Sequence, residues 1–238
     1  MSPNPTSIAA VCNVFNIETR PFPYQQIWNI PHLCNAQQQG KTRHLTKMRQ
    51  CGADWFFSLE ALIDAVVTGR NQIFLGCSPS SAMIAKNYMQ YFLNTSELHK
   101  KLSPTQPYPN QIALANGAII YFIGPQSLSA DLHGNVYVSE YAWAKSPKNL
   151  ITIAESLSMH ARYHTTFYTT PSKNPEAWQA YQSVISAKPS IMTFTANDAR
   201  NSGVSLFDDN WLSEMEKFRT PDEWRMLFMC EWPMEGRQ

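Results

Sequence analysis

The stretch "KMRQCGADW", residues 47–55, lies between a short apolar segment and a long amphipathic pattern, and it decides the expected fold. Upstream, "RHLTKM" (43–48) has the composition of a short strand. Downstream, "DWFFSLEALIDAVVTG" (54–69) repeats apolar residues at helical spacing. A strand, a glycine-containing loop and a helix form the arrangement in which backbone N–H groups cradle a phosphate. The usual lysine and hydroxyl residue at the end of such a loop are absent, because Ala53 and Asp54 occupy those positions.

Apolar runs that alternate with helical patterns continue along the chain and predict an α/β fold. Further strands are expected in 72–77, from 135, in 165–172 and in 191–195, and further helices in 22–40, 78–94, 147–161, 175–187, 208–218 and 221–232. Because the strands are continuous apolar runs, we expect a mostly parallel sheet with helices on both faces. Asn116-Gly117 predicts an inserted β-hairpin whose two central residues both adopt positive φ.

Composition limits the class of protein. The chain has 238 residues, a formal net charge of +1 and five cysteines. A charge this small gives no strong field for a polyanion, so any nucleic-acid contact must be local. An odd cysteine count without a CxxC pair favours a reducing compartment over a disulfide framework or a zinc knuckle. The first residues show neither a signal peptide nor a membrane span.

Four loops, at 49–54, 77–81, 139–143 and 169–172, are expected at the carboxyl ends of the strands, where ligands bind in such sheets. Glu140 follows an apolar strand, as do the carboxylates that nucleotide hydrolases use for metal binding and water activation. Considered alone, however, one glutamate after a strand is more often a solvated loop residue.

The ordered series of segments resembles the large terminase subunit of tailed bacteriophages, the ATPase that drives DNA into the procapsid. The likeness runs from about Pro21 to Trp232. The matching segments are "FPYQ" (22–25), the phosphate loop with its helix and next strand (48–82), a hairpin (114–124), "LHGNVYVSEYAW" (132–143), "TTFYTTPS" (165–172) and a helical tail (207–232). The resemblance implies a P-loop NTPase, RecA-like (ASCE) fold that binds ATP and Mg2+.

The resemblance also assigns nucleotide-binding residues. The phosphate loop would comprise Lys47, Arg49, Gln50, Cys51, Gly52, Ala53 and Asp54. Gln25 would read adenine. Arg49, helped by Lys47, would replace the missing lysine, because a guanidinium can donate hydrogen bonds to two phosphate oxygens at once. The alternative, that Arg49 simply faces solvent at the end of its strand, is equally compatible with the sequence.

The expected Mg2+ ligands have exchanged positions in this chain. Asp54 stands where the family has a threonine or serine, and Ser139 stands where it has an aspartate. We expect the two to share one Mg2+ ion, which needs oxygen ligands. If the exchange instead reflects sequence drift in a degraded gene, Asp54 repels the triphosphate by about 4 kcal/mol at a separation of about 4 Å. Glu140 would orient or deprotonate the attacking water, and Thr169 and Thr170 would couple the γ-phosphate state to the fold.

The resemblance implies a domain plan and partners as well. Residues 1–20 would be a lead-in, 21–205 the ATPase domain and 206–238 a helical linker where a nuclease domain would begin, so no DNA cleavage is expected. The implied partners are double-stranded DNA held by its backbone, the portal protein, the small terminase subunit and further copies in a homo-oligomeric ring. The implied location is the cytoplasm of the bacterial host, without a membrane. Either Arg162 or Arg200 could act in trans as an arginine finger, and the sequence does not choose between them. The alternative function is that of a truncated, non-hydrolysing prophage remnant.

Overall fold

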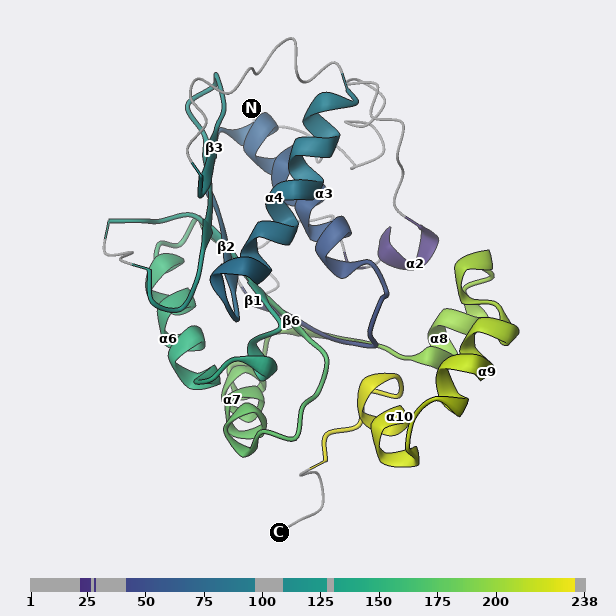
Figure 1. Cartoon of the computed structure of the whole chain (residues 1–238). Helices are drawn as coiled ribbons and strands as arrows, with labels where there is room; N and C mark the ends of the chain where they lie inside the picture. The colour runs from purple at the N-terminus through teal and green to yellow at the C-terminus, as the bar shows by residue number, and fades with distance from the viewer. Residues whose placement is uncertain (1–21, 27, 29–41, 97–108, 128–130, 234–238) are drawn as a thin grey trace.

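The computed structural model describes residues 22–26, 28, 42–96, 109–127 and 131–233, and its centre is a seven-stranded sheet (Figure 1). The strands are β1 (Thr42–Lys47), β2 (Gln72–Gly76), β3 (Gln111–Ala113), β4 (Ile119–Ile123), β5 (Asn135–Ser139), β6 (Thr165–Thr169) and β7 (Ser190–Phe194). Their order across the sheet is β3-β4-β2-β5-β6-β1-β7. Every described pairing is parallel except that of β3 with β4. The mostly parallel sheet with an inserted hairpin is therefore confirmed.

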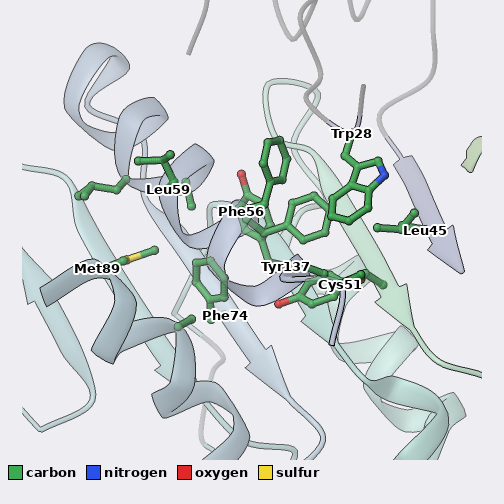
Figure 2. Close-up of a cluster of buried hydrophobic side chains, with 14 of the residues drawn as sticks. Trp28, Leu45, Cys51, Phe56, Leu59, Phe74, Met89 and Tyr137 are labelled. Atoms are coloured by element: carbon green, nitrogen blue, oxygen red, sulfur yellow. The ribbon is translucent and has the colours of Figure 1, made fainter. Parts of the chain in front are cut away.

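Helices cover both faces of this sheet, as predicted. They are α2 (Pro23–Gln26), α3 (Ala53–Thr68), α4 (Pro79–Asn94), α6 (Pro147–Leu157), α7 (Pro175–Ser186), α8 (Ala196–Asn201), α9 (Asp209–Lys217) and α10 (Pro221–Leu227), with short 3-10 turns η2 (Tyr141–Trp143) and η3 (Ser205–Phe207). Alternation along β2 separates two cores: Phe74 joins the cluster under α3 and α4, while Ile73 and Leu75 join the cluster under α6 and α7. Figure 2 shows part of the first cluster, with Cys51 among its aromatic neighbours.

Local sequence signals fix the start of α4. Ser78 caps this helix and forms a capping box with Ser81. Pro79 follows in the first turn, where its missing N–H costs nothing. The preceding Gly76 is required because a Cβ there would lie 2.6 Å from the backbone nitrogen of Ala82. The turn from β2 into α4 is consequently tight.

The hairpin between β3 and β4 is present, but the prediction of positive φ at both central residues is wrong. Gly117 has φ of +88°, whereas Asn116 is not among the positive-φ residues. The Gly117 N–H donates to the Leu114 carbonyl at 3.0 Å, so the loop is one residue longer than expected and ends in a left-handed glycine. The Asn116 side chain instead donates to the Ala65 carbonyl, 2.9 Å away at the end of α3.

The C-terminal third differs from expectation in its details. The helix predicted to extend to residue 161 ends at Leu157, and α8 was not predicted. The two predicted tail helices are present as α9 and α10, although the second ends at Leu227 rather than at residue 232. Of the helix predicted in 22–40, the structure shows α2 and a turn at Trp28, and residues 27 and 29–40 lie outside the described residues.

Candidate active site

An open cleft of about 690 Å³ lies where the loops after β1, β2 and β5 meet. It is lined by Lys47, Arg49, Gln50, Cys51, Gly52, Ala53, Asp54, Trp55, Cys77, Ile84, Tyr88, Glu140 and Trp143. Its size falls in the range of small-molecule and cofactor sites. Three of the four loops predicted to form the site therefore line this cleft, and the loop after β6 meets it through contacts with Glu140.

The loop between β1 and α3 is held in shape from the α2 side. Gln50 and Gly52 have φ of +60° and +72°. The Tyr24 hydroxyl donates to the Cys51 carbonyl at 3.0 Å, and the Gln25 amide donates to the carbonyls of Cys51 and Gly52 at 3.3 and 3.2 Å. Because a trans peptide sets N–H opposite to C=O, the N–H groups that follow these carbonyls point away from α2. The loop thereby has a fixed backbone, as phosphate binding requires.

Gln25 is buried, and both ends of its amide are hydrogen-bonded in this structure. In addition to its two bonds to the loop, its Oε1 accepts from the Phe22 N–H at 3.0 Å. A Cβ on Gly52 would lie 2.8 Å from Gln25 Nε2, so glycine lets the two segments meet. The structure thus gives Gln25 a role in supporting the loop, and its reading of adenine stays a prediction.

Lys47 and Glu140 form an ion pair at the base of the cleft. The Lys47 Nζ lies 2.5 Å from Glu140 Oε1 and also donates to Thr170 Oγ1 at 3.4 Å. Burial by itself lowers the pKa of Lys47, but the charges of Glu140, Cys51 and Asp54 and the hydrogen bond to Glu140 together outweigh that effect, so the net pKa is raised. Lys47 is therefore a buried cation.

Glu140 is also bound by the end of β6. Its Oε2 accepts from the Thr170 N–H at 2.9 Å and from Thr169 Oγ1 at 3.3 Å. Its backbone has φ of +51°, a left-handed conformation that is strained for a non-glycine residue. Glu140, Thr169, Thr170 and Lys47 thus form one network that joins the ends of β1, β5 and β6.

Arg49 lies at the rim of the cleft. It is exposed, and its guanidinium stacks 4.7 Å from the ring centre of Trp143. Trp143 is held in turn by a hydrogen bond from its Nε1 to the Thr170 carbonyl at 3.0 Å. The sequence favours Arg49 over Lys47 as the phosphate-binding charge, whereas the structure places Lys47 deeper and in contact with Glu140.

Asp54 and Ser139, the predicted pair, are in direct contact. The Ser139 hydroxyl donates to Asp54 Oδ1 at 2.9 Å, and the Tyr168 hydroxyl donates to the same oxygen at 2.9 Å. Burial raises the pKa of Asp54, and Glu140 raises it further, against the lowering effect of Lys47 and the two hydroxyls. Tyr168 is not among the residues that the sequence indicates, because only the folded sheet shows that it pairs with Ser139 beside the site.

Comparison with known proteins identifies the chain. The family model for the N-terminal region of the terminase large subunit, T4likevirus type, matches residues 45–237. The chain belongs to this family. The expected resemblance to large terminase subunits is therefore confirmed.

Three similar proteins illustrate how this terminase chain compares. The probable terminase ATPase subunit of Haemophilus phage HP1 is 35% identical over 131 residues, covering 55% of this chain and 21% of the relative. The terminase ATPase subunit of Escherichia phage P2 is 28% identical over 240 residues, covering 88% of this chain and 38% of the relative. The large terminase of bacteriophage HK97 has a TM-score of 0.74 at 14% identity, covering 98% of this chain and 56% of that one. This likeness shows the shared P-loop, RecA-like fold, and the chain spans less than half the length of the two curated relatives.

The oxygen ligands of the terminase cleft fit an Mg2+ ion that is also bound by a phosphate. Within the described segments, no group of three or more His, Cys, Asp or Glu side chains could hold a metal ion. Asp54 and Glu140 nevertheless supply two carboxylates at the cleft. Mg2+ commonly binds through one or two carboxylates together with waters and substrate phosphates. These residues therefore fit an Mg2+ ion that arrives with a phosphate ligand.

Three aromatic residues follow one another near the start of α3. Phe56 and Phe57 are fully buried in the core. Trp55 is half-buried, because it packs on Phe92 and also lines the cleft. In the part of the chain that the structure describes, no helix combines the length and the apolar character needed to cross a membrane.

Proposed function

We propose that this chain is the ATP-binding and ATP-hydrolysing motor domain of a phage terminase large subunit, which drives viral DNA into the procapsid. Family membership and relatives named as terminase ATPase subunits support this proposal. The observation that carries it is the ion pair of Lys47 with Glu140 at the base of a loop-lined cleft. A buried cation and a carboxylate beside a phosphate loop are the pair that phosphoryl transfer uses for charge stabilisation and water positioning.

Each part of the cleft has a distinct task in this proposal. The loop from Arg49 to Asp54 holds the phosphates of ATP with the backbone N–H groups that follow Arg49. Lys47 neutralises phosphate charge from the base of the cleft, and Arg49 does so from the rim. Gln25 fixes the loop from below, and its contact with adenine is part of the proposal.

Asp54 and Ser139 would hold Mg2+ in this site, with their roles exchanged relative to the family pattern. When bound, Mg2+ neutralises charge on the phosphates and helps to orient them for attack. The direct contact between Ser139 and Asp54 supports this pairing, because the two side chains lie close enough to serve one ion.

Glu140 would orient the attacking water or accept its proton. In this structure one carboxylate oxygen is bound by Lys47 and the other by Thr170 and Thr169. Phosphate oxygens compete with Glu140 for Lys47, so nucleotide binding weakens the ion pair between Lys47 and the Glu140 carboxylate. The remaining bonds to Thr169 and Thr170 then link the state of the site to β6, which is the coupling role expected of these two residues.

A second candidate function is that of a non-hydrolysing remnant that binds partners. The missing loop lysine and the acidic Asp54 are the features that favour it. The contacts of Lys47 with Glu140 and of Asp54 with Ser139 weigh against it, because both pairs lie at one cleft and each joins groups that a nucleotide site uses.

The proposal extends to partners and to the division of the chain. The partners are double-stranded DNA bound through its backbone, the portal protein, the small terminase subunit and other copies in a ring, all in the cytoplasm of the bacterial host. Residues 21–205 form the ATPase domain, and 206–238 form the helical linker. The Arg49 N–H donates to the Leu227 carbonyl at 3.0 Å, which supports direct contact between the phosphate loop and that linker.

Calorimetric titration of ATP with Mg2+ tests the proposal. We expect the wild-type chain to bind, Lys47→Gln to lose binding, Arg49→Gln to weaken it, and Glu140→Gln to keep binding without turnover. Lys217→Gln, on the exposed end of α9, serves as a matched control and should bind like the wild type. Absence of binding at millimolar ATP, in samples whose circular dichroism shows a folded chain, would refute the ATPase assignment.

A further inference from the structure

We propose that Tyr168 is a positioning residue: together with Ser139 it fixes the Asp54 carboxylate so that the second oxygen, Oδ2, is presented to the cleft as a ligand for Mg2+. This inference rests on the proposed function of the cleft and deepens it, because it explains how a chain with exchanged ligand positions still forms a cation site. Tyr168 itself touches neither nucleotide nor metal in this scheme, and it acts only through Asp54.

Strand and helix geometry bring the Tyr168 hydroxyl to Asp54. Side chains alternate along β6, and the ring of Tyr168 packs on Phe57 of α3 with 4.6 Å between ring centres. Asp54 lies three residues before Phe57, so both occupy the same face of α3. The Tyr168 ring therefore lies against Phe57 while its hydroxyl reaches Asp54 Oδ1, 2.9 Å away.

The two hydroxyl donors come from neighbouring strands and converge on one oxygen. Ser139 and Tyr168 are register partners in the β5–β6 pairing, so their side chains leave the sheet side by side. Both residues are buried, and the Ser139 hydroxyl lies 2.9 Å from the same Oδ1. Within the described residues, Asp54 Oδ2 receives no hydrogen bond, while Asp54 as a whole lines the cleft. One carboxylate oxygen is therefore fixed and the other is free for a ligand.

The charges in the cleft show what kind of ligand that oxygen takes. Its base carries the carboxylates of Asp54 and Glu140 against the one buried cation Lys47. A triphosphate would bring more negative charge, and like charges in a partly buried cleft repel one another strongly. A divalent cation between Asp54 and the phosphates turns that repulsion into attraction. The free oxygen is a hard ligand of the kind that Mg2+ prefers.

The competing explanation is purely structural, because a buried tyrosine hydroxyl needs some hydrogen-bond partner and Asp54 supplies one. Both explanations predict that Tyr168→Phe lowers thermal stability. Only the positioning role predicts a change in the effect of Mg2+ on nucleotide binding. The informative quantity is the ratio of the ATP dissociation constant in EDTA to that in Mg2+.

The experiment measures this ratio by calorimetry for the wild type, Tyr168→Phe, Ser139→Ala and Asp54→Asn. Loss of a residue that orients a metal ligand typically costs about tenfold or more in metal affinity, so the Mg2+ advantage should fall about tenfold in Tyr168→Phe. Asp54→Asn should remove the advantage, and binding in EDTA should not weaken in Tyr168→Phe. Tyr137→Phe is the matched control: it is the same change on β5, and its hydroxyl bonds Glu60 Oε1 at 3.1 Å instead of the cleft.

The possible outcomes separate this inference from the proposed function. A wild-type ratio well above one that Tyr168→Phe leaves unchanged would overturn the role of Tyr168, and the ATPase proposal would stand. A wild-type ratio of one would also overturn it, since no metal would then be held through Asp54. If the wild type binds no ATP in either buffer, both proposals fall. If Tyr168→Phe does not fold, Phe57→Leu replaces it, because this change removes the ring that Tyr168 packs against and leaves the cleft lining intact. An unchanged ratio in Phe57→Leu would then overturn the role of Tyr168, and a reduced ratio would support it.

Discussion

Protonation of His44 should destabilise the fold as the pH falls below neutrality. This residue lies on β1, fully buried, with its Nε2 2.8 Å from the Tyr141 hydroxyl and its ring edge-on to Tyr181. Burial lowers the pKa of His44 from 6.5 to about 3. The folded state therefore keeps this imidazole neutral at a pH where the unfolded chain already binds a proton. Its contribution to stability is complete above pH 6.5 and is lost progressively toward pH 3.

The size of the effect follows from the two pKa values. One pKa unit corresponds to about 1.4 kcal/mol. With pKa values of 6.5 unfolded and about 3 folded, lowering the pH from 7 to 5 costs about 2 kcal/mol in the free energy of unfolding through His44 alone. For a fold whose total stability is about 5–15 kcal/mol, this loss is large enough to measure.

Urea unfolding followed by tryptophan fluorescence at pH 7 and pH 5 measures it. His44→Gln keeps a polar group near Tyr141 but cannot be protonated, so its stability should fall by about 2 kcal/mol less than that of the wild type over this interval. His160→Gln, at an exposed position, is the control and should show the wild-type difference. Equal pH dependence in the wild type and in His44→Gln would refute the assignment, because His44 would then titrate alike in both states.

Three further substitutions test the packing that supports the site. Gly76→Ala should destabilise the chain by about 1–3 kcal/mol in urea unfolding, since its Cβ would lie 2.6 Å from the Ala82 nitrogen; an unchanged midpoint would contradict the tight turn. Phe57→Ala should cost about 3–5 kcal/mol by the same assay because it opens a cavity in the core, whereas exposed Phe218→Ala should cost little, and similar losses would argue against the core position. Thr220→Ala should lower stability by about 1 kcal/mol in thermal unfolding through loss of the α10 capping box, and a melting temperature equal to that of the wild type would show that this cap is not needed.

Much of the fold could be predicted from the sequence, because the signals involved are local. The helical spacing of apolar residues after Asp54 and the apolar run of β2 each depend on neighbouring residues alone. The edge of the sheet that carries the site could also be predicted, since parallel strands end on the same side. The Asn116-Gly117 turn was less predictable in detail. The Asn116 amide donates to a carbonyl at the end of α3, and this long-range contact cannot be predicted from the residues of the turn alone.

The details of the site were less accessible. The sequence points to Lys47, Arg49 and Glu140, but it favours Arg49 over Lys47, because depth in a cleft depends on how loops pack. It also treated Gln25 as free to meet adenine, whereas the folded chain engages that amide with the phosphate loop. Tyr168 gave no signal in its own segment, which reads as an ordinary buried strand.

By itself, the sequence determined the order of helices and strands, the position of the phosphate loop and the residue types available for chemistry. The tertiary structure alone decided which of those residues meet. Tyr168 and Asp54 are 114 positions apart, and Lys47 and Glu140 are 93 apart. Their contacts depend on strand order, on register and on the face that α3 turns to the sheet. These are properties of the packed chain, because the free energy that sets them comes from burial summed over both cores rather than from any one segment.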